Sequence, residues 1–309
     1  MKVQIEVPAT SANLGPGFDA LGLALDVCNR IEVELDPESD EVAVTAFTGD
    51  TSQALDPRDN LLCAAYRRWG ETSEKPIPGA RFTVETRIPV GRGLGASAAA
   101  IVAGLSAAAF AETEKLPRDR ILRLASLMEG HADNAVAAVL GGMTVAFIDG
   151  EDVHAMNAVN HATLGIALFI PDAPLLTAEA RACMPKQVPV ADAVANIGRA
   201  AYLTTAMIWG RWELFGPAMR DRLHQPYRAT LLPTLEDVIA AAEAAGAYGA
   251  ALSGGGPAVI AFCPREETDP IAAAMERCAV ERAWPGRGLA TSIRHLGVQV
   301  RKLPDQGLS

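Results

Sequence analysis

The chain has 309 residues, of which 50% are apolar and 21% are charged. This composition is typical of a folded protein with one large or two medium domains and excludes a disordered chain. The formal net charge of −10 disfavours a partner such as nucleic acid or an anionic membrane, because both are bound through clustered Lys and Arg.

The sequence also bears on the cellular compartment. Its five cysteines are scattered and include no C-x-x-C pair, which favours reduced thiols in the cytoplasm over disulfides or a zinc site. Glu6 and Pro8 stand where a signal peptide needs an apolar core. The longest uncharged run, residues 93–111, is rich in Ala, Gly and Ser, so we expect a buried helix rather than a membrane span.

Hydrophobic periodicity and turn residues divide the first half of the chain into short elements. Strands are predicted at residues 2–7, 21–25, 30–35, 41–47, 81–86 and 143–148. Helices are predicted at residues 60–69, 96–111, 118–128 and up to 140, with Asp59, Asp133 or Asn134 as N-caps. Residues 8–19 are rich in Pro, Gly and small polar groups and are predicted to form a loop.

The second half continues this mixture of elements. Strands are predicted at residues 164–170, 250–252, 258–262, 291–294 and 298–303, and helices near residues 191–212, 235–245 and 270–278. Residues 149–152 are polar and precede a fresh apolar strand, so we expect domains at residues 1–152 and 153–309. Because strands and helices do not alternate strictly, the pattern favours an α+β fold over a doubly wound sheet.

A glycine-rich segment separates the strand at 81–86 from the helix at 96–111. It reads Pro-Val-Gly-Arg-Gly-Leu-Gly-Ala-Ser-Ala-Ala-Ala from residue 89, with glycines at 91, 93 and 95. A strand that leads through glycines into a helix presents unpaired N–H groups and the positive end of the helix dipole, and both favour phosphate. We therefore expect a nucleotide here; the alternative is a tight turn before a core helix.

Three other motifs do not fit this loop. A Walker A loop needs a Lys followed by Ser or Thr, and no Lys follows these glycines. Gly91, Gly93 and Ala96 approach a Rossmann fingerprint, but residues 111–115 end a helix where that fold needs an acidic residue after a second strand. Residues 95–99 lack the final glycine of a nucleophile elbow.

The pattern Pro-x-x-x-Gly-Leu-Gly-x-Ser-Ala-Ala at residues 89–99 closely resembles the phosphate loop of the galactokinase, homoserine kinase, mevalonate kinase and phosphomevalonate kinase (GHMP kinase) family. Residues 8–19, Pro-Ala-Thr-Ser-Ala-Asn-Leu-Gly-Pro-Gly-Phe-Asp, followed by Leu21-Gly22, are similar to its first motif in the homoserine kinase form. Residues 252–257, Leu-Ser-Gly-Gly-Gly-Pro, are similar to its third. The resemblance implies an N-terminal domain like the second domain of ribosomal protein S5 and a C-terminal ferredoxin-like domain.

The resemblance also implies ATP and Mg²⁺. The residues implied to bind ATP through this loop are Pro89, Val90, Gly91, Arg92, Gly93, Leu94, Gly95, Ala96, Ser97 and Ala98. Asn60 matches a position that contacts the nucleotide base, although a helix cap explains it equally well. Ser97 and Glu129 are the implied metal ligands, since Mg²⁺ prefers hard oxygen atoms. Ala96 departs from the family pattern, which often has Ser there.

The other segments resemble the homoserine kinase form, which implies transfer of phosphate from ATP to the side-chain hydroxyl of L-homoserine, a step toward threonine. This zwitterion needs a carboxylate for its amine and an Arg for its carboxylate. The implied substrate-binding residues are Asn13, Asp19, His131, Asn134, Arg181 and Arg228, with Asp133 beside them. The implied catalytic residues are Ser97, Glu129, Thr177 and Arg228.

Several alternatives stay open. The acceptor could be a mevalonate-pathway compound or a sugar, or the chain could sense a nucleotide or amino acid without turnover, as the Ala96 departure hints. Read alone, Glu129 is a solvated helix-end carboxylate, His131 an ordinary core or surface histidine, and each Arg a surface ion pair. No catalytic base is identified, so we expect orientation, Mg²⁺ and the loop dipole to carry the rate. The oligomeric state, a homodimer included, and control by threonine stay open.

Overall fold

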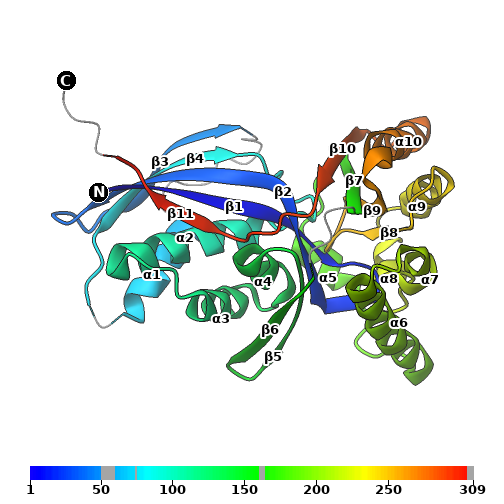
Figure 1. Ribbon diagram of the computed structural model, residues 1–309, viewed down its shortest axis with the longest axis horizontal. Coiled ribbons are helices and arrows are strands. Elements are labelled where there is room, and N and C mark those ends of the chain that lie inside the picture. The colour runs from blue at the N-terminus through cyan, green and yellow to red at the C-terminus, as the bar shows by residue number, and fades with distance from the viewer. Residues whose placement is uncertain (50–59, 74, 160–163, 305–309) are drawn as a thin grey trace.

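The computed structural model describes residues 1–49, 60–73, 75–159 and 164–304. These residues form two adjoining units, each built from a β-sheet covered by helices (Figure 1). The α+β class predicted from the sequence is confirmed, because both sheets consist mainly of antiparallel pairs.

The first unit is organised around a mixed sheet. Its strands are β1 (Lys2–Asn13), β2 (Gly17–Asp36), β3 (Val42–Gly49), β4 (Gly79–Thr86), β5 (Met143–Asp149), β6 (Asp152–Val159) and β11 (Gln299–Lys302). The order is β11-β1-β2-β4-β3, with β5 paired to the first part of β2 and β6 paired to β5. Helices α1 (Leu61–Glu71), α2 (Ala96–Thr113), α3 (Arg118–Glu129) and α4 (Asp133–Leu140) lie together on one face (Figure 1).

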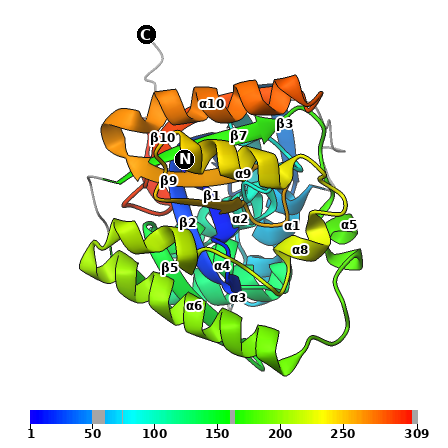
Figure 2. The same ribbon diagram turned by 90° about the vertical axis from the view of Figure 1, so that its right-hand side faces the viewer.

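The second unit contains a sheet in the order β10-β7-β9-β8. Its strands are β7 (Leu164–Pro171), β8 (Gly249–Leu252), β9 (Val259–Pro264) and β10 (Gly286–Ser292), and its covering helices are α9 (Leu235–Ala244) and α10 (Thr268–Glu281) (Figure 2). The β7-α9-β8-β9-α10-β10 order with antiparallel neighbours confirms the predicted ferredoxin-like arrangement. Inserted between β7 and α9 are α5 (Thr177–Ala182), α6 (Val190–Trp209), α7 (Phe215–Ala218) and α8 (Gln225–Arg228).

Helix α2 is the buried centre of the first unit. It contacts α1, α3, α4 and β1, and its residues from Ala98 to Ala109 are mostly buried. Among the helices that the structure describes, α2 is the one long and apolar enough to cross a membrane. Its burial instead shows an apolar surface that faces protein, as the sequence predicts. Gly104 permits the close approach of α1, because a Cβ atom there would lie 2.2 Å from the carbonyl oxygen of Leu62.

The largest difference from the sequence prediction lies at the first motif. Residues 8–13 were predicted as a loop, but β1 runs to Asn13, and the predicted strands at 21–25 and 30–35 are one continuous β2. The two strands stay paired from Lys2↔Glu34 to Asn13↔Gly17, with register shifts between Pro8 and Ala9 and between Ala12 and Asn13. Cross-strand pairing therefore outweighs the turn propensity of these residues. Helices α5, α7 and α8 and strand β6 were not predicted.

The position of β6 also bears on the division between the units. β6 pairs with β5 as far as Val159, so the first sheet continues beyond residue 152. Near the other end of the chain, β11 returns to pair with β1, where Val300 lies opposite Ile5. Sheet membership therefore favours a division after Val159, with β11 rejoining the first unit, in place of the predicted domains 1–152 and 153–309.

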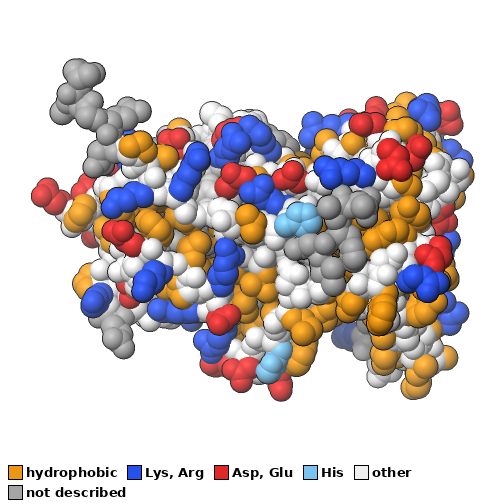
Figure 3. Space-filling model, in the orientation of Figure 1, with side chains coloured by type: hydrophobic (Ala, Val, Ile, Leu, Met, Phe, Trp, Pro, Cys, Tyr) orange, Lys and Arg blue, Asp and Glu red, His pale blue; other side chains and the backbone are white. Residues whose placement is uncertain are grey.

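Charge is mixed on the surface of both units. On the face shown in Figure 3, Lys and Arg side chains are interspersed with Asp and Glu. Because the net charge is −10 and the basic side chains on this face are interspersed with acidic ones (Figure 3), an anion that binds this protein must be attracted by local geometry.

We expect Gly104→Ala to destabilise the protein, although alanine favours a helix over glycine by about 1 kcal/mol. The added methyl group would collide with the α1 backbone at Leu62, and overpacking of this kind costs about 1–3 kcal/mol. Gly198→Ala in α6 is the matched control, because its added methyl group would have no heavy atom within 4 Å, so it should stabilise. Urea unfolding of both variants measures the two effects, and a Gly104→Ala variant more stable than the wild type would contradict this packing.

Candidate active site

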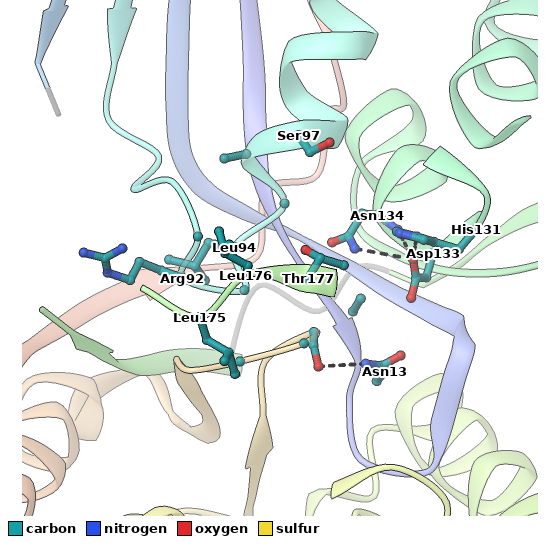
Figure 4. A pocket seen from close by; sticks show the side chains of 18 of the residues that line it. Asn13, Arg92, Leu94, Ser97, His131, Asp133, Asn134, Leu175, Leu176 and Thr177 are labelled. Atoms are coloured by element: carbon teal, nitrogen blue, oxygen red, sulfur yellow. Dashed lines mark hydrogen bonds and ion pairs between the residues drawn. The ribbon is translucent and has the colours of Figure 1, made fainter. Parts of the chain in front are cut away.

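A polar cavity of about 290 Å³ lies where the two units meet. Its walls come from the end of β1, the glycine loop, the α3–α4 junction, the segment that leads into α5, and the loop after β8. Figure 4 shows side chains from several of these elements, among them Ser97, Asn134, Thr177 and Asn13, around one space. Segments far apart in the sequence therefore converge on one site.

The carbonyl groups of the glycine loop are all held by other parts of the chain. Each carbonyl oxygen from residue 91 to residue 95 accepts a hydrogen bond. The donors, in that order, are the N–H of Leu175 (2.9 Å), the N–H of Ala258 (3.1 Å), the hydroxyl of Ser253 (2.7 Å), the N–H of Thr10 (3.1 Å) and the N–H of Ala99 (2.9 Å). With the carbonyl groups fixed by the fold, the peptide planes of the loop are fixed as well.

The loop N–H groups, by contrast, are available. In the described part of the chain, none of the backbone N–H groups of residues 91–98 has a hydrogen-bond acceptor, and the N-cap of α2, Gly95, provides no side-chain cap. Gly91, Gly93 and Gly95 have φ angles of 69°, 73° and 70°. A Cβ atom at Gly95 would lie 1.9 Å from Oγ1 of Thr10. Only glycine suits these positions, and the arrangement supports the predicted phosphate site.

The side chain of Arg92 does not serve this anion site. Its Nε donates to the carbonyl of Pro171 at 2.8 Å and its Nη1 to that of Val90 at 2.7 Å, while Nη2 bonds the carbonyl of Asp172. In Figure 4 the side chain extends away from Ser97 and Thr177. The guanidinium therefore fastens the loop to the end of β7, and any contact of Arg92 with phosphate is through its backbone.

Ser97 and Glu129 meet at the N-terminus of α2. The Ser97 hydroxyl donates to Oε1 of Glu129, whose side chain at the end of α3 is only 8% exposed. The reading of Glu129 as a solvated carboxylate is therefore wrong. Within the described ranges, no group of three or more His, Cys, Asp or Glu side chains is arranged to hold a metal. Two protein oxygens beside a phosphate site nevertheless suit Mg²⁺, which takes its other ligands from phosphate and water.

His131 lies next to this pair. Its Nε2 is 3.6 Å from Oε2 of Glu129, and its Nδ1 is 2.9 Å from Oδ1 of Asp133, which also accepts the N–H of Asn134 at 2.7 Å. Burial lowers the pKa of His131, but the hydrogen bond with Asp133 and the charges of Asp133 and Glu129 outweigh burial and raise it above 6.5. His131 is thus a fixed, partly buried group in the cavity wall.

Asp19 and Arg181 form an ion pair across the cavity. Nη2 of Arg181 is 2.8 Å from Oδ1 of Asp19, and Nη1 is 3.3 Å from Oδ2. Their side chains are 35% and 39% exposed, so both charges are open to solvent and to a ligand. Asn13 orients Asp19, because its Oδ1 accepts the N–H of Asp19 at 3.0 Å while its Nδ2 donates to the carbonyl of Gly254 at 2.9 Å.

The second predicted arginine, Arg228, is buried, with 2% exposure. Its Nε donates to the carbonyl of Ala180 at 3.2 Å, and its Nη1 donates to the carbonyl of Gly254 and to Nδ1 of His224, each at 3.0 Å. The alternative reading as a surface ion pair is therefore wrong for Arg228. Its bonds tie α5 and the loop after β8 to α8, and Arg228 also lines the cavity.

The remaining predicted residues divide into two groups. Thr177, at the start of α5, lines the cavity with an exposed side chain, and Asn134 lines it while accepting the Thr10 hydroxyl at 2.8 Å. Asn60, Pro89 and Ala98 are not among the lining residues. Asn60 caps α1, its Oδ1 accepting the N–H of Cys63 at 2.9 Å, and Asp59 lies outside the described residues.

The residues that sequence reasoning missed are mostly structural supports of the cavity. His224 and the glycines of residues 254–256 lay within stretches that resembled the family, but no role was assigned to them. Thr10 and Leu175 act through backbone groups that bond the loop, and no sequence pattern signals such bonds.

The chain is similar to known proteins over nearly its whole length. Residues 60–142 match the family model described as GHMP kinases N terminal domain, and residues 193–281 match GHMP kinases C terminal. A homoserine kinase of Carboxydothermus hydrogenoformans is 42% identical over 261 residues, 84% of each chain. One of Prochlorococcus marinus is 38% identical over 302 residues, 96% of this chain and 93% of the relative. A crystal structure of homoserine kinase from Cytophaga hutchinsonii is similar with a TM-score of 0.87 at 28% identity, covering 97% of both chains.

We expect the stability advantage of the wild type over His224→Asn to shrink as the pH falls from about 7.5 to 5.5. Burial holds the pKa of His224 below 6.5, so the unfolded chain takes up a proton at a higher pH than the folded protein. The stability that the neutral ring contributes is fully present above the unfolded pKa of His and is lost as the pH falls through the folded pKa. Asn does not titrate, so the variant shows no such loss. Urea unfolding across this range measures the difference, and a constant difference would contradict a buried neutral His224. His131 is present in both proteins, so its titration cancels.

Proposed function

The chain belongs to the homoserine kinases of the GHMP kinase family, and we propose that its cavity transfers the γ-phosphoryl group of ATP to the side-chain hydroxyl of L-homoserine. The observation that carries this assignment is the pair of opposite charges, Asp19 and Arg181, beside the free N–H groups of the glycine loop. One cavity thus offers an anion site and both charges of an amino-acid zwitterion.

The donor phosphates are bound by the loop. The N–H groups of residues 93–97 and the dipole of α2 supply partial positive charge where the β- and γ-phosphates lie, in a protein whose net charge is −10. Because the carbonyl groups are held elsewhere, the N–H groups need no rearrangement when phosphate arrives. Preorganised donors of this kind stabilise the transition state more than water can.

The acceptor is bound by exchange of ion-pair partners. The ammonium group of homoserine pairs with Asp19, and its carboxylate pairs with Arg181 and with the unbonded side of Arg228. Mevalonate carries only the negative charge and would leave Asp19 without a partner. A neutral sugar supplies neither charge and gains nothing from Asp19 or Arg181. His131 and Asn134 line the same cavity and contact the polar part of the acceptor.

Ser97 and Glu129 are the residues that would hold Mg²⁺, because their oxygen atoms converge at the loop. A bound ion would neutralise charge on the phosphates. Thr177, with an exposed hydroxyl at the cavity wall, helps to place the acceptor hydroxyl beside the γ-phosphate. No side chain is assigned as a base; orientation accounts for most of the rate, and the proton passes to the phosphate.

The partners are thus two small molecules, homoserine and ATP, and we expect the protein to work in the cytoplasm, where both are available. A homodimer stays a prediction.

The direct test is ADP release with a panel of acceptors that comprises homoserine, serine, threonine, mevalonate and galactose. We expect turnover with homoserine to exceed turnover with every other acceptor. Robust turnover of mevalonate or a sugar with none of homoserine would contradict the proposal. ATP binding in calorimetry without turnover of any acceptor would instead favour a sensor.

We expect Asp19→Asn to raise KM for homoserine about tenfold or more while KM for ATP changes by less than about twofold. The variant loses the partner of the ammonium group, so it should also lose the wild-type preference for homoserine over 4-hydroxybutyrate, which has no amine. Asp192→Asn is the matched control, since Asp192 pairs with Arg222 outside the cavity at 3.2 Å. An unchanged preference in Asp19→Asn would remove Asp19 from the acceptor site.

We expect Glu129→Gln to lower kcat about a hundredfold and to shift the Mg²⁺ dependence of the rate to higher concentration. Gln keeps the size of the side chain and its bond to Ser97 but removes the charge that attracts the ion. The rate measured against Mg²⁺ concentration at saturating ATP tests this, with Glu151→Gln, an exposed residue outside the cavity, as control. An unchanged Mg²⁺ dependence would exclude Glu129 as a ligand.

A further inference from the structure

We propose that His224 is a positioning residue for the acceptor site: as a neutral imidazole, it aims the Arg228 guanidinium at the carboxylate of the amino-acid substrate. The inference rests on the proposed function, because it names the group that orients one of the two acceptor arginines. His224 itself is fully buried and is not among the residues that line the cavity.

The hydrogen bonds of the ring fix its protonation state. Nε2 of His224 lies 2.7 Å from the carbonyl oxygen of Gly15, which can only accept, so Nε2 carries the hydrogen. Nδ1 lies 3.0 Å from Nη1 of Arg228, which can only donate, so Nδ1 must be unprotonated. One neutral tautomer satisfies both contacts, the imidazolium satisfies only the contact with Gly15, and the other neutral tautomer satisfies neither.

The surroundings of the ring hold it in this orientation. Oδ1 of Asp221 accepts the N–H of Leu223 at 3.1 Å, and its Oδ2 accepts those of His224 at 2.8 Å and Gln225 at 2.6 Å, which fixes the backbone on either side of the ring. The ring of Phe18 stacks on His224 with centroids 5.3 Å apart and an interplanar angle of 23°. Because the ring is held at its backbone and on one face, its orientation is fixed. The orientation of the Arg228 guanidinium therefore depends on the ring.

The hydrogen bonds of Arg228 show which of its N–H groups this orientation leaves for a ligand. A guanidinium has five N–H groups, and three of them are used by Ala180, Gly254 and His224. Among the described residues, Nη2 of Arg228 has no hydrogen-bond partner, and Arg228 lines the cavity. The contacts to the two carbonyls and to His224 thus leave the two N–H groups of Nη2 for a ligand carboxylate.

The charges around His224 explain why it must be neutral. Oδ2 of Asp221 is 3.7 Å from Nε2, Asp19 lies across the site, and the Arg228 cation faces Nδ1. Burial lowers the pKa of His224, and Arg228 lowers it further against the opposing effects of Asp221 and Asp19. A proton on Nδ1 would place an N–H of His224 opposite an N–H of Arg228 and an imidazolium cation next to the guanidinium cation. Their repulsion would displace the guanidinium.

Two substitutions separate the two ring nitrogens. In His224→Asn, the amide oxygen replaces Nδ1 as acceptor for Arg228, but the bond to Gly15 is lost. In His224→Gln, the amide nitrogen replaces Nε2 as donor to Gly15, but Arg228 loses its acceptor. We expect KM for homoserine to rise about tenfold or more in His224→Gln and distinctly less in His224→Asn, with KM for ATP within about twofold in both.

A purely structural role predicts a different result: equal changes in KM for homoserine and ATP, in step with the loss of thermal stability. That outcome, or a larger homoserine effect in His224→Asn than in His224→Gln, would overturn the proposal. In an Arg228→Lys background, His224→Gln should add less than about twofold, because the residue acts through Arg228; full additivity would also overturn it.

The pH profile provides a readout that stays valid if His224→Gln fails to fold. As the pH falls through the lowered pKa of His224, KM for homoserine should rise more steeply in the wild type than in His224→Asn, since only the wild type protonates at this position. The comparison runs from about pH 7.5 to the lowest pH at which both proteins stay folded. Equal slopes would contradict the proposal. Absence of homoserine turnover by the wild type would contradict the proposed function instead, so the two failures are distinguishable.

Discussion

The structure depends on one constraint: every carbonyl group of the glycine loop from residue 91 to residue 95 is bonded to another part of the fold. The donors belong to β1, to the segment before α5, to the loop after β8, to the residue that precedes β9 and to α2 itself. Because the peptide planes are fixed in this way, the N–H groups are left toward the cavity. An anion site in an acidic protein arises from this geometry and not from a cluster of basic side chains.

The same bonds join the two units at the site of chemistry. The loop belongs to the first unit, but Arg92 bonds the end of β7, and the loop after β8 bonds the loop carbonyls in return. On the acceptor side, Asn13 and Arg228 both bond the carbonyl of Gly254. The residues proposed to bind the phosphate donor and those proposed to bind the acceptor are thus held by one network, so their relative positions are fixed by the fold before either substrate binds.

The sequence predicted those features that depend on local chemistry. The glycines before an uncharged helix indicated the anion site, whereas Asp19 and Arg181 were assigned through the resemblance to homoserine kinase segments, in agreement with the charges of the acceptor. The direction of a side chain could not be predicted: Arg92 stands in the phosphate motif, yet its guanidinium bonds β7. Nor could burial: the resemblance placed Arg228 at the site and assigned no role to His224, but the burial of both side chains results from tertiary contacts between distant segments.

The claim that the loop geometry creates the phosphate site is tested most directly by isothermal titration of ATP into Gly95→Ala and Gly150→Ala. Both glycines have positive φ, 70° and 62°, but a Cβ atom would collide with Thr10 at Gly95 and meet nothing within 4 Å at Gly150. The account predicts that ATP affinity falls about a hundredfold in Gly95→Ala and stays at the wild-type value in Gly150→Ala. Wild-type ATP affinity in a Gly95→Ala variant that still unfolds cooperatively would contradict it.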